Sequence, residues 1–216
     1  MRFKTTLFVV LLGLMINRSL AQDYVLDYIL DADSVKYEGY ISEATPRSIK
    51  VGLIRKNKDQ EFPAGAIKGY FDGMSSMTYI SKKVLNAGTD EEDFIFIPKG
   101  KTINEETTVK FKEGEMKFIL NEKVSYLFIT TNVDLSPGNR IVVTELYLEN
   151  DKVGLKKIPI GFSGDKTETS RILVGYFWDN FSILKKINTG QIKNTAKGIK
   201  ELVQEYLLSN TTTTNN

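Results

Sequence analysis

Clustered carboxylates are the groups in this sequence whose types and spacing could do acid–base chemistry. Asp31 and Asp33 stand two residues apart, and residues 90–93 read D-E-E-D. A pair of carboxylates can hydrolyse a glycosidic bond, one as general acid and the other as base or nucleophile. However, residues 31–34 (D-A-D-S) separate two expected strands, and Asp and Ser favour turns at such positions. We therefore interpret Asp31 and Asp33 as turn residues.

The acidic run at residues 90–93 is interpreted as an exposed, solvated loop. Weak calcium binding is the alternative, although the run lacks the glycine and the terminal glutamate of an EF-hand loop. Neither cluster supplies a catalytic residue that we would assign. A carboxylate-dependent enzyme acting on glycans or peptidoglycan stays open as the alternative function.

The chain contains no histidine and no cysteine. Ser-His-Asp and Cys-His catalytic arrangements are therefore impossible, and the usual zinc ligands are missing. The sequence also lacks a Gly-rich phosphate loop and a G-x-S-x-G elbow. We expect no catalytic residue, no cofactor and no bound transition metal, and hence a protein that is not an enzyme.

Trp178 is the remaining residue that could contact a ligand. It is the only tryptophan and belongs to the run Tyr176, Phe177, Trp178 and Asp179 (Y-F-W-D). Aromatic residues at helical spacing usually pack in the core. If Tyr176 and Phe177 face inward, Trp178 lies roughly 100° further round the helix, towards its rim. There it could stack on a sugar ring or anchor a partner, so we assign Trp178 as a candidate surface contact.

The elements that would position these residues begin with a β-rich body over residues 22–160. Ile49, Val51 and Leu53 alternate with Lys50 and Gly52, which puts three apolar side chains on one face of a strand. Residues 94–97 (F-I-F-I) are apolar on both faces and precede a proline, so we expect a short strand buried on both sides. Residues 150–151 (N-D) favour a tight hairpin. Residues 84–93 are a loop at which the β body could divide in two.

A helical segment is expected over residues 166–209. Asn180 favours a break between its first two helices, because Asn is a common N-cap residue. The last helix has an apolar stripe with Asn194 or Thr195 available as its cap, and its stripe residues are Ile199, Leu202, Val203, Tyr206 and Leu207. Residues 210–216 (N-T-T-T-T-N-N) have no apolar anchor and are expected to be disordered. The sequence thus predicts an α+β fold, a mainly antiparallel β body followed by two or three C-terminal helices.

Residues 1–21 have the features of a secretory signal peptide. Arg2 and Lys4 precede an apolar run at residues 7–16, and a small-residue site ends at Ala21. We expect cleavage between Ala21 and Gln22. The apolar run is shorter than the roughly 20 residues that span a bilayer, so we expect no membrane span after processing. Without cysteine the mature chain has no lipid attachment residue, and we expect it to be periplasmic or secreted.

The charge balance argues against nucleic acid as a partner. The whole chain has 29 Lys and Arg against 27 Asp and Glu, and three of the cations (Arg2, Lys4 and Arg18) lie within residues 1–21. The mature chain would therefore carry a net charge of −1, whereas nucleic-acid binders show a basic excess. We expect a non-catalytic exported protein that binds or scaffolds an envelope or extracellular partner.

The C-terminal pattern resembles that of a broad set of uncharacterised exported proteins of Bacteroidota. The similarity rests on Y-F-W-D at residues 176–179 and on I-K-E-L-V-Q-E-Y at residues 199–206, and it extends to a turn and strand around Asp33 and Gly39 and to I-K-G-Y at residues 67–70. The chain has Ala32 where a glycine usually stands in such turns, and N-F at residues 180–181 where C-P is frequent. The resemblance implies no catalytic residues, and it implies a short helix at residues 116–120, where the alternation of apolar residues alone indicates a strand.

Overall fold

The computed structural model describes residues 26–54, 59–85, 93–161 and 165–211. In chain order the elements are β1 (Asp27–Asp31), β2 (Lys36–Ala44), β3 (Ser48–Leu53), β4 (Gln60–Pro63), the short 3-10 helix η1 (Ala64–Ala66), β5 (Ile67–Asp72), β6 (Met77–Val84), β7 (Asp93–Lys99), β8 (Ile103–Phe111), β9 (Gly114–Leu120), β10 (Ser125–Ser136), β11 (Asn139–Asn150), β12 (Gly154–Lys157), α2 (Lys166–Tyr176), α3 (Phe181–Asn188) and α4 (Ala196–Thr211). The α+β prediction is confirmed, with helices following a β body.

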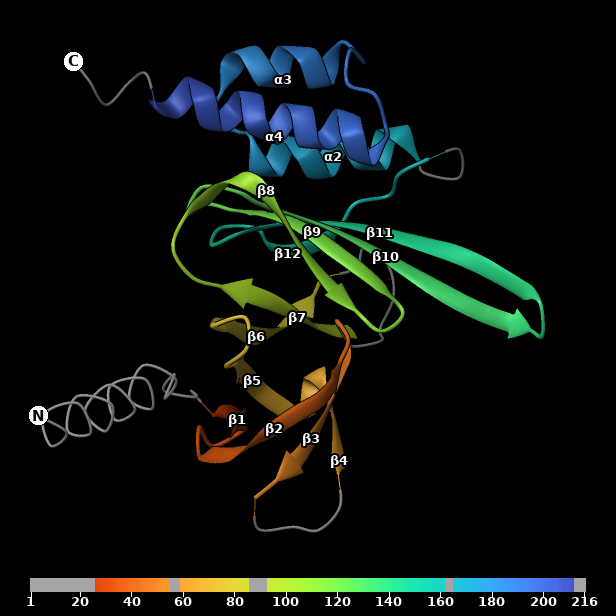
Figure 1. Ribbon diagram of the computed structural model, residues 1–216. Coiled ribbons are helices and arrows are strands. Elements are labelled where there is room, and N and C mark those ends of the chain that lie inside the picture. Colours follow the sequence, from red (N-terminus) through yellow and green to blue (C-terminus); the bar gives the residue numbers. More distant parts are fainter. Residues whose placement is uncertain (1–25, 55–58, 86–92, 162–164, 212–216) are drawn as a thin grey trace, which may run out of the picture.

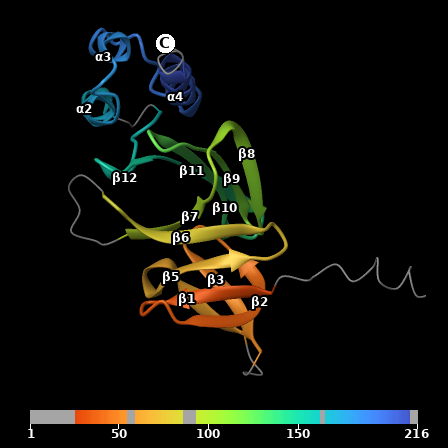
Figure 2. The same cartoon turned by 90° about the vertical axis from the view of Figure 1, so that its left-hand side faces the viewer.

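The strands form one continuous, strongly curved sheet. Its order is β4-β3-β2-β1-β5-β6-β12-β11-β10-β9-β8, and β7 adds to β6 beside this path. Neighbouring strands are antiparallel except β12 and β6, which meet in parallel at Leu155 and Val84. Figures 1 and 2 show β1–β5 at one end of the molecule, β8–β12 in the middle and the three helices stacked on the far side of β8–β12.

Three apolar clusters hold these layers together. One lies among the N-terminal strands, a second lies between the β6–β7 hairpin and β9–β12, and the third joins the opposite face of β9–β11 to the helices. Alternate residues of a strand point to opposite faces, so a strand between two clusters must be apolar throughout. β7 confirms this prediction, because Ile95 and Ile97 enter the second cluster and Phe96 enters the first.

Residues 84–93 were expected to form a loop, but Val84 and Asp93 are the ends of β6 and β7, which pair with each other, and residues 86–92 lie outside the described part of the chain. β6 and β7 pair continuously from Thr78 and Lys99 to Val84 and Asp93, so the segment closes a hairpin. The first two clusters meet at this hairpin. The sequence predicted that the strand ends before Pro98, but β7 includes Pro98 and continues to Lys99. Proline is tolerated there because β7 has β6 as its only paired neighbour among the described residues, which makes it an edge strand.

Two local expectations need correction. Residues 116–120 are not a helix but part of β9, which pairs with β10 on one side and β8 on the other. Met116 and Phe118 enter the second cluster while Ile119 enters the third, so the alternation was the correct indicator. The β11–β12 hairpin exists, but its loop comprises residues 151–153, because Asn150 pairs with Gly154.

The helix boundaries follow from side-chain caps. Asn180 Oδ1 accepts a hydrogen bond from Ile183 N at 3.1 Å and separates α2 from α3, as predicted. Thr195 Oγ1 accepts from Gly198 N at 3.1 Å at the start of α4. α4 continues to Thr211, so Asn210 is helical instead of belonging to the tail, and its Nδ2 donates to Tyr206 O at 2.8 Å. Residues 212–216 lie outside the described part of the chain.

Candidate functional site

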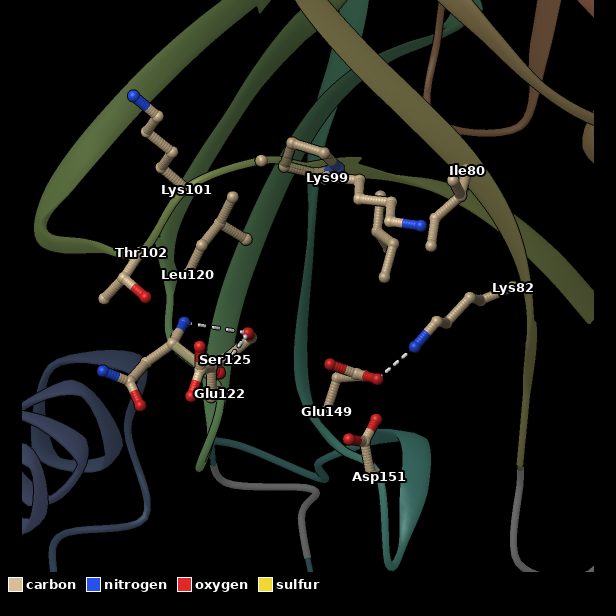
Figure 3. A pocket seen from close by; sticks show the side chains of 14 residues that line it. Ile80, Lys82, Lys99, Lys101, Thr102, Leu120, Glu122, Ser125, Glu149 and Asp151 are labelled. Atoms are coloured by element: carbon tan, nitrogen blue, oxygen red, sulfur yellow. Dashed lines mark hydrogen bonds and ion pairs between the residues drawn. The ribbon is translucent and has the colours of Figure 1, made fainter.

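A cavity of about 340 Å³ opens between the β6–β7 hairpin and the ends of β9–β11. Figure 3 shows its charged side chains, which come from separate parts of the chain. Lys82 lies on β6 and Lys99 at the end of β7, whereas Glu149 lies on β11 and Asp151 in the loop that follows. The cavity therefore collects cations from one wall and carboxylates from the other.

Strand alternation places Lys82 and Glu149 opposite each other. Lys82 shares a face of β6 with Val84, and Glu149 shares a face of β11 with Tyr147, and both apolar residues belong to the second cluster. The two inward faces thus change from apolar to charged where the cluster meets the cavity. Lys82 Nζ and the carboxylate of Glu149 form an ion pair, drawn as a dashed line in Figure 3. This pair ties β6 to β11 across the cavity.

A second cavity of about 270 Å³ adjoins the first, and Glu122 and Asp151 line both. We call the two together the groove. Its second half contains Trp178, whose surface is 54% exposed, and the Lys152 Nζ lies 3.8 Å from the centroid of the indole ring. A lysine over an indole face is a cation–π contact. The groove thus runs from a region of paired charges to an aromatic platform.

The end of α2 determines how Trp178 is presented. Tyr176 and Phe177 are fully buried in the third cluster, and Trp178 follows directly and turns outwards. This exposure agrees with the prediction from helical spacing. Tyr176 Oη lies 2.8 Å from Leu148 O and 2.7 Å from Gly154 O, which fixes the end of α2 to the β11–β12 hairpin.

Asp179 and Tyr206 form the wall of the groove beside Trp178. The Tyr206 hydroxyl donates to Asp179, with oxygen separations of 2.9 and 3.1 Å. Burial, together with this hydrogen bond and the charge of Asp179, raises the pKa of Tyr206 to about 12. The hydroxyl is therefore a neutral donor at physiological pH, and its hydrogen bond links α4 to the segment that carries Trp178.

The other residues singled out in the sequence lie in turns or outside the described part. Asp31 Oδ1 accepts hydrogen bonds from Asp33 N at 2.9 Å and Val35 N at 2.8 Å, as expected for a turn between β1 and β2. Of the acidic run only Asp93 is described, and it forms an ion pair with Arg47. Within residues 26–54, 59–85, 93–161 and 165–211, no group of three or more carboxylates could hold a metal ion.

A second charged network, which sequence reasoning did not find, surrounds Glu145 on β11. Arg47 Nη2 lies 3.1 Å from Glu145 Oε1, and Lys157 Nζ lies 2.5 Å from the same oxygen. Burial opposes ionisation of Glu145, but the hydrogen bonds and positive charges of Lys157 and Arg47 outweigh it and lower its pKa. This network joins β11 and β12 to the loop between β2 and β3, so its role is to connect the N-terminal strands to the rest.

Comparison of the chain with protein-family models, with curated proteins and with solved structures finds no match. Among the helices that the structure describes, none is long and apolar enough to cross a membrane.

Proposed function

We propose that this chain is an exported, non-catalytic binding protein of the cell envelope or the extracellular space, and that the groove holds an elongated polar ligand. The observation that carries this proposal is the exposed Trp178, which lies in a groove beside hydrogen-bonding carboxylates. An indole that is more than half exposed gains from burial against a ligand, and the polar groups around it can fix the orientation of that ligand.

A glycan is the ligand class that these groups suit best. The apolar C–H face of a sugar can stack on the Trp178 ring, while its hydroxyl groups donate to carboxylates such as Glu122 and Asp151. Lys152 now lies over the ring on a flexible four-carbon stem, so an incoming sugar can displace it. The groove combines two adjoining cavities, of about 340 and 270 Å³, and we therefore propose a ligand of more than one sugar unit.

The localisation in this proposal rests on the sequence of residues 1–21, which lie outside the described part of the chain. Cleavage between Ala21 and Gln22 would release a mature chain into the periplasm or the medium. Mass spectrometry of protein recovered outside the cytoplasm should find Gln22, or its cyclised form, at the N-terminus. Recovery of intact Met1 from a membrane fraction would contradict export as a processed protein.

The alternative, a carboxylate-dependent enzyme acting on glycans or peptidoglycan, is favoured by one observation. Three carboxylates, Glu122, Glu149 and Asp151, line the same cavity. Glu149 is engaged by Lys82, which leaves Glu122 and Asp151 as the candidate pair. If the protein is an enzyme, replacing either of them by its amide should abolish the release of reducing ends from cell-wall glycan. A binding protein releases none in any variant.

The fluorescence of Trp178 provides a binding assay, because the chain has no other tryptophan. Binding of oligosaccharides of glucose or N-acetylglucosamine, or of soluble peptidoglycan fragments, should shift the indole emission in a saturable titration. Trp178→Ala should abolish binding measured by calorimetry. Phe181→Ala is the matched control, since Phe181 is an aromatic residue at the start of α3 that is 83% exposed and does not line the groove. Equal loss of binding in both variants, or no titration with any glycan, would contradict the proposal.

A further inference from the structure

The β10–β11 hairpin extends beyond its neighbouring strands as a two-stranded arm. β9 pairs with β10 only as far as Thr131, and β12 pairs with β11 only from Tyr147 to Asn150 among the described residues. Figure 1 shows the rest of the hairpin projecting from the side of the molecule. We define the arm as residues 132–144, and its long free edge is the outer side of β11 at residues 139–145.

The free edge of β11 is exposed and rich in β-branched residues. Residues 139–144 are all exposed, and Val142, at 59%, lies between Ile141 and Val143 at 40% and 38%. Natural edge strands usually prevent pairing with lysine, proline or a bulge. Residues 139–145 contain no lysine, proline or bulge, because the irregularity in the hairpin falls on β10, between Asp134 and Ser136, and their cation, Arg140, forms an ion pair with Asp134 of β10. β11 itself is regular and open to another strand.

The pairing of β11 with β12 shows which backbone groups of β11 point towards the free edge. Leu146 O accepts a hydrogen bond from Ile158 N at 2.7 Å, so the N–H and C=O of Leu146 point towards the β12 side. Backbone groups alternate along a strand. The N–H and C=O groups of Val142 and Thr144, and those of Arg140, therefore point outwards from the free edge. Three residues offer donors and acceptors in a row.

We propose that a second copy of this chain adds to this edge, so that β11 pairs with β11 of its partner in antiparallel orientation. Val142 is the middle of residues 139–145, and its backbone groups point outwards. A two-fold axis beside Val142 therefore pairs the whole free stretch with itself and closes hydrogen bonds between the two Val142 residues and between each Arg140 and the opposite Thr144.

This register is self-complementary in its side chains. Ile141 faces Val143 of the other copy, and the two Val142 side chains meet on the opposite face of the sheet. No like charges are directly opposed, because Arg140 lies across from Thr144 and Asn139 from Glu145. A shift of the axis to Arg140 would oppose two arginines, which is destabilising. A shift of the axis to Thr144 would pair Arg140 with Leu148 of the other copy, but Leu148 already pairs with β12. Because this edge is complementary to itself, a second copy of the chain is the partner that fits it.

Disulfide trapping tests the register directly, because the chain has no native cysteine. Residues in a hydrogen-bonded antiparallel pair have Cα atoms about 5.5 Å apart, which is within the range that a disulfide can bridge. Val142→Cys should therefore form a covalent dimer under mild oxidation. Leu208→Cys is the control, since Leu208 is 69% exposed on α4, away from the arm. Equal cross-linking of both variants would overturn the proposed pairing.

Charge exchange at the two-fold axis provides the second test. The wild type should show a monomer–dimer equilibrium in analytical ultracentrifugation over micromolar to near-millimolar concentrations. Val142→Lys and Val142→Glu should each be monomeric, since each opposes two like charges, whereas an equimolar mixture should restore the dimer. Val142→Thr keeps the backbone groups and the β propensity and should dimerise as the wild type does. A monomeric wild type at all concentrations would overturn self-pairing, as would a Val142→Lys variant that still dimerises.

Discussion

The attachment of α4 to the sheet can be tested by replacing Leu202 with alanine. Ile199, Leu202, Val203 and Tyr206 are all buried in the cluster between the helices and β9–β11. A helix of this length is marginal alone in water, so its stability has to come from burial of that stripe. Leu202→Ala removes buried carbon atoms and leaves a cavity, and changes of this kind cost about 2–5 kcal/mol of the free energy of unfolding.

The matched control is Lys197→Ala on the exposed side of the same helix. Lys197 is 83% exposed in its side chain, and its ion pair with Glu201 is 3.8 Å long, so the change should cost less than about 0.5 kcal/mol. Lys200, on the same helix, is a poorer control. Its Nζ lies 3.1 Å from Glu106 on β8, and Lys200→Ala should cost up to about 1 kcal/mol.

The measurement is urea unfolding followed by circular dichroism, with the slope of the transition checked for each variant. A shift of the midpoint at constant slope reports a change in stability. Leu202→Ala should unfold at clearly lower urea than Lys197→Ala. If both variants unfold at the wild-type midpoint, α4 does not pack on the sheet through this stripe.

Three further changes probe other parts of the fold. Glu145→Gln should cost about 1–2 kcal/mol at pH 7, because Glu145 is mostly buried and its partners Arg47 and Lys157 are half exposed. Since the folded-state pKa of Glu145 is lowered, its ionised form stabilises the fold above the ordinary carboxyl pKa and ceases to do so as the pH falls through the lowered value. The difference between variant and wild type in thermal melts should therefore shrink below about pH 4, and a difference independent of pH would contradict this assignment. Tyr176→Phe should cost about 1–3 kcal/mol in urea melts, because the hydroxyl proton shared by the buried Leu148 O and the partly buried Gly154 O is lost; an unchanged midpoint would mean that water replaces it. Gly114→Ala should give little soluble folded protein, because a Cβ atom there would lie 1.8 Å from Thr130 O, and normal expression and melting would show that β9 and β10 can separate locally.

Local periodicity predicted the elements of this fold where one face or both faces of an element are buried. The alternation of Ile49, Val51 and Leu53 predicted β3, and the unbroken apolar run of β7 predicted its place between two clusters. Residues 116–120 are the instructive failure, because the resemblance implied a helix there although the alternation of apolar residues indicated the strand that the structure has. Five residues are too few to separate a strand from a helical turn, and the choice is made by pairing with β8 and β10, which is not visible in a short pattern.

The groove was predictable only in part. The exposure of Trp178 follows from a local argument, because Tyr176 and Phe177 directly precede it and both face the core. The pairing of Lys82 with Glu149 joins residues 67 positions apart and depends on the path of the sheet. The only local signal was that Lys82 and Glu149 each stand at an inward position of a strand face that is otherwise apolar. Such a charge indicates where a core ends, but it does not identify the residue with which it pairs.

The two proposals concern separate parts of β11 and can fail independently. Val142 and Glu149 are seven residues apart on this strand, and a β-strand rises about 3.4 Å per residue, so they are separated by roughly 24 Å. A second copy that pairs at Val142 therefore approaches the arm and not the residues of the groove. Since β11 runs regularly from one site to the other, the same strand can present a free edge at one end and a charged cavity wall at the other. Loss of dimerisation should leave the groove able to bind, and loss of Trp178 should leave the arm able to pair.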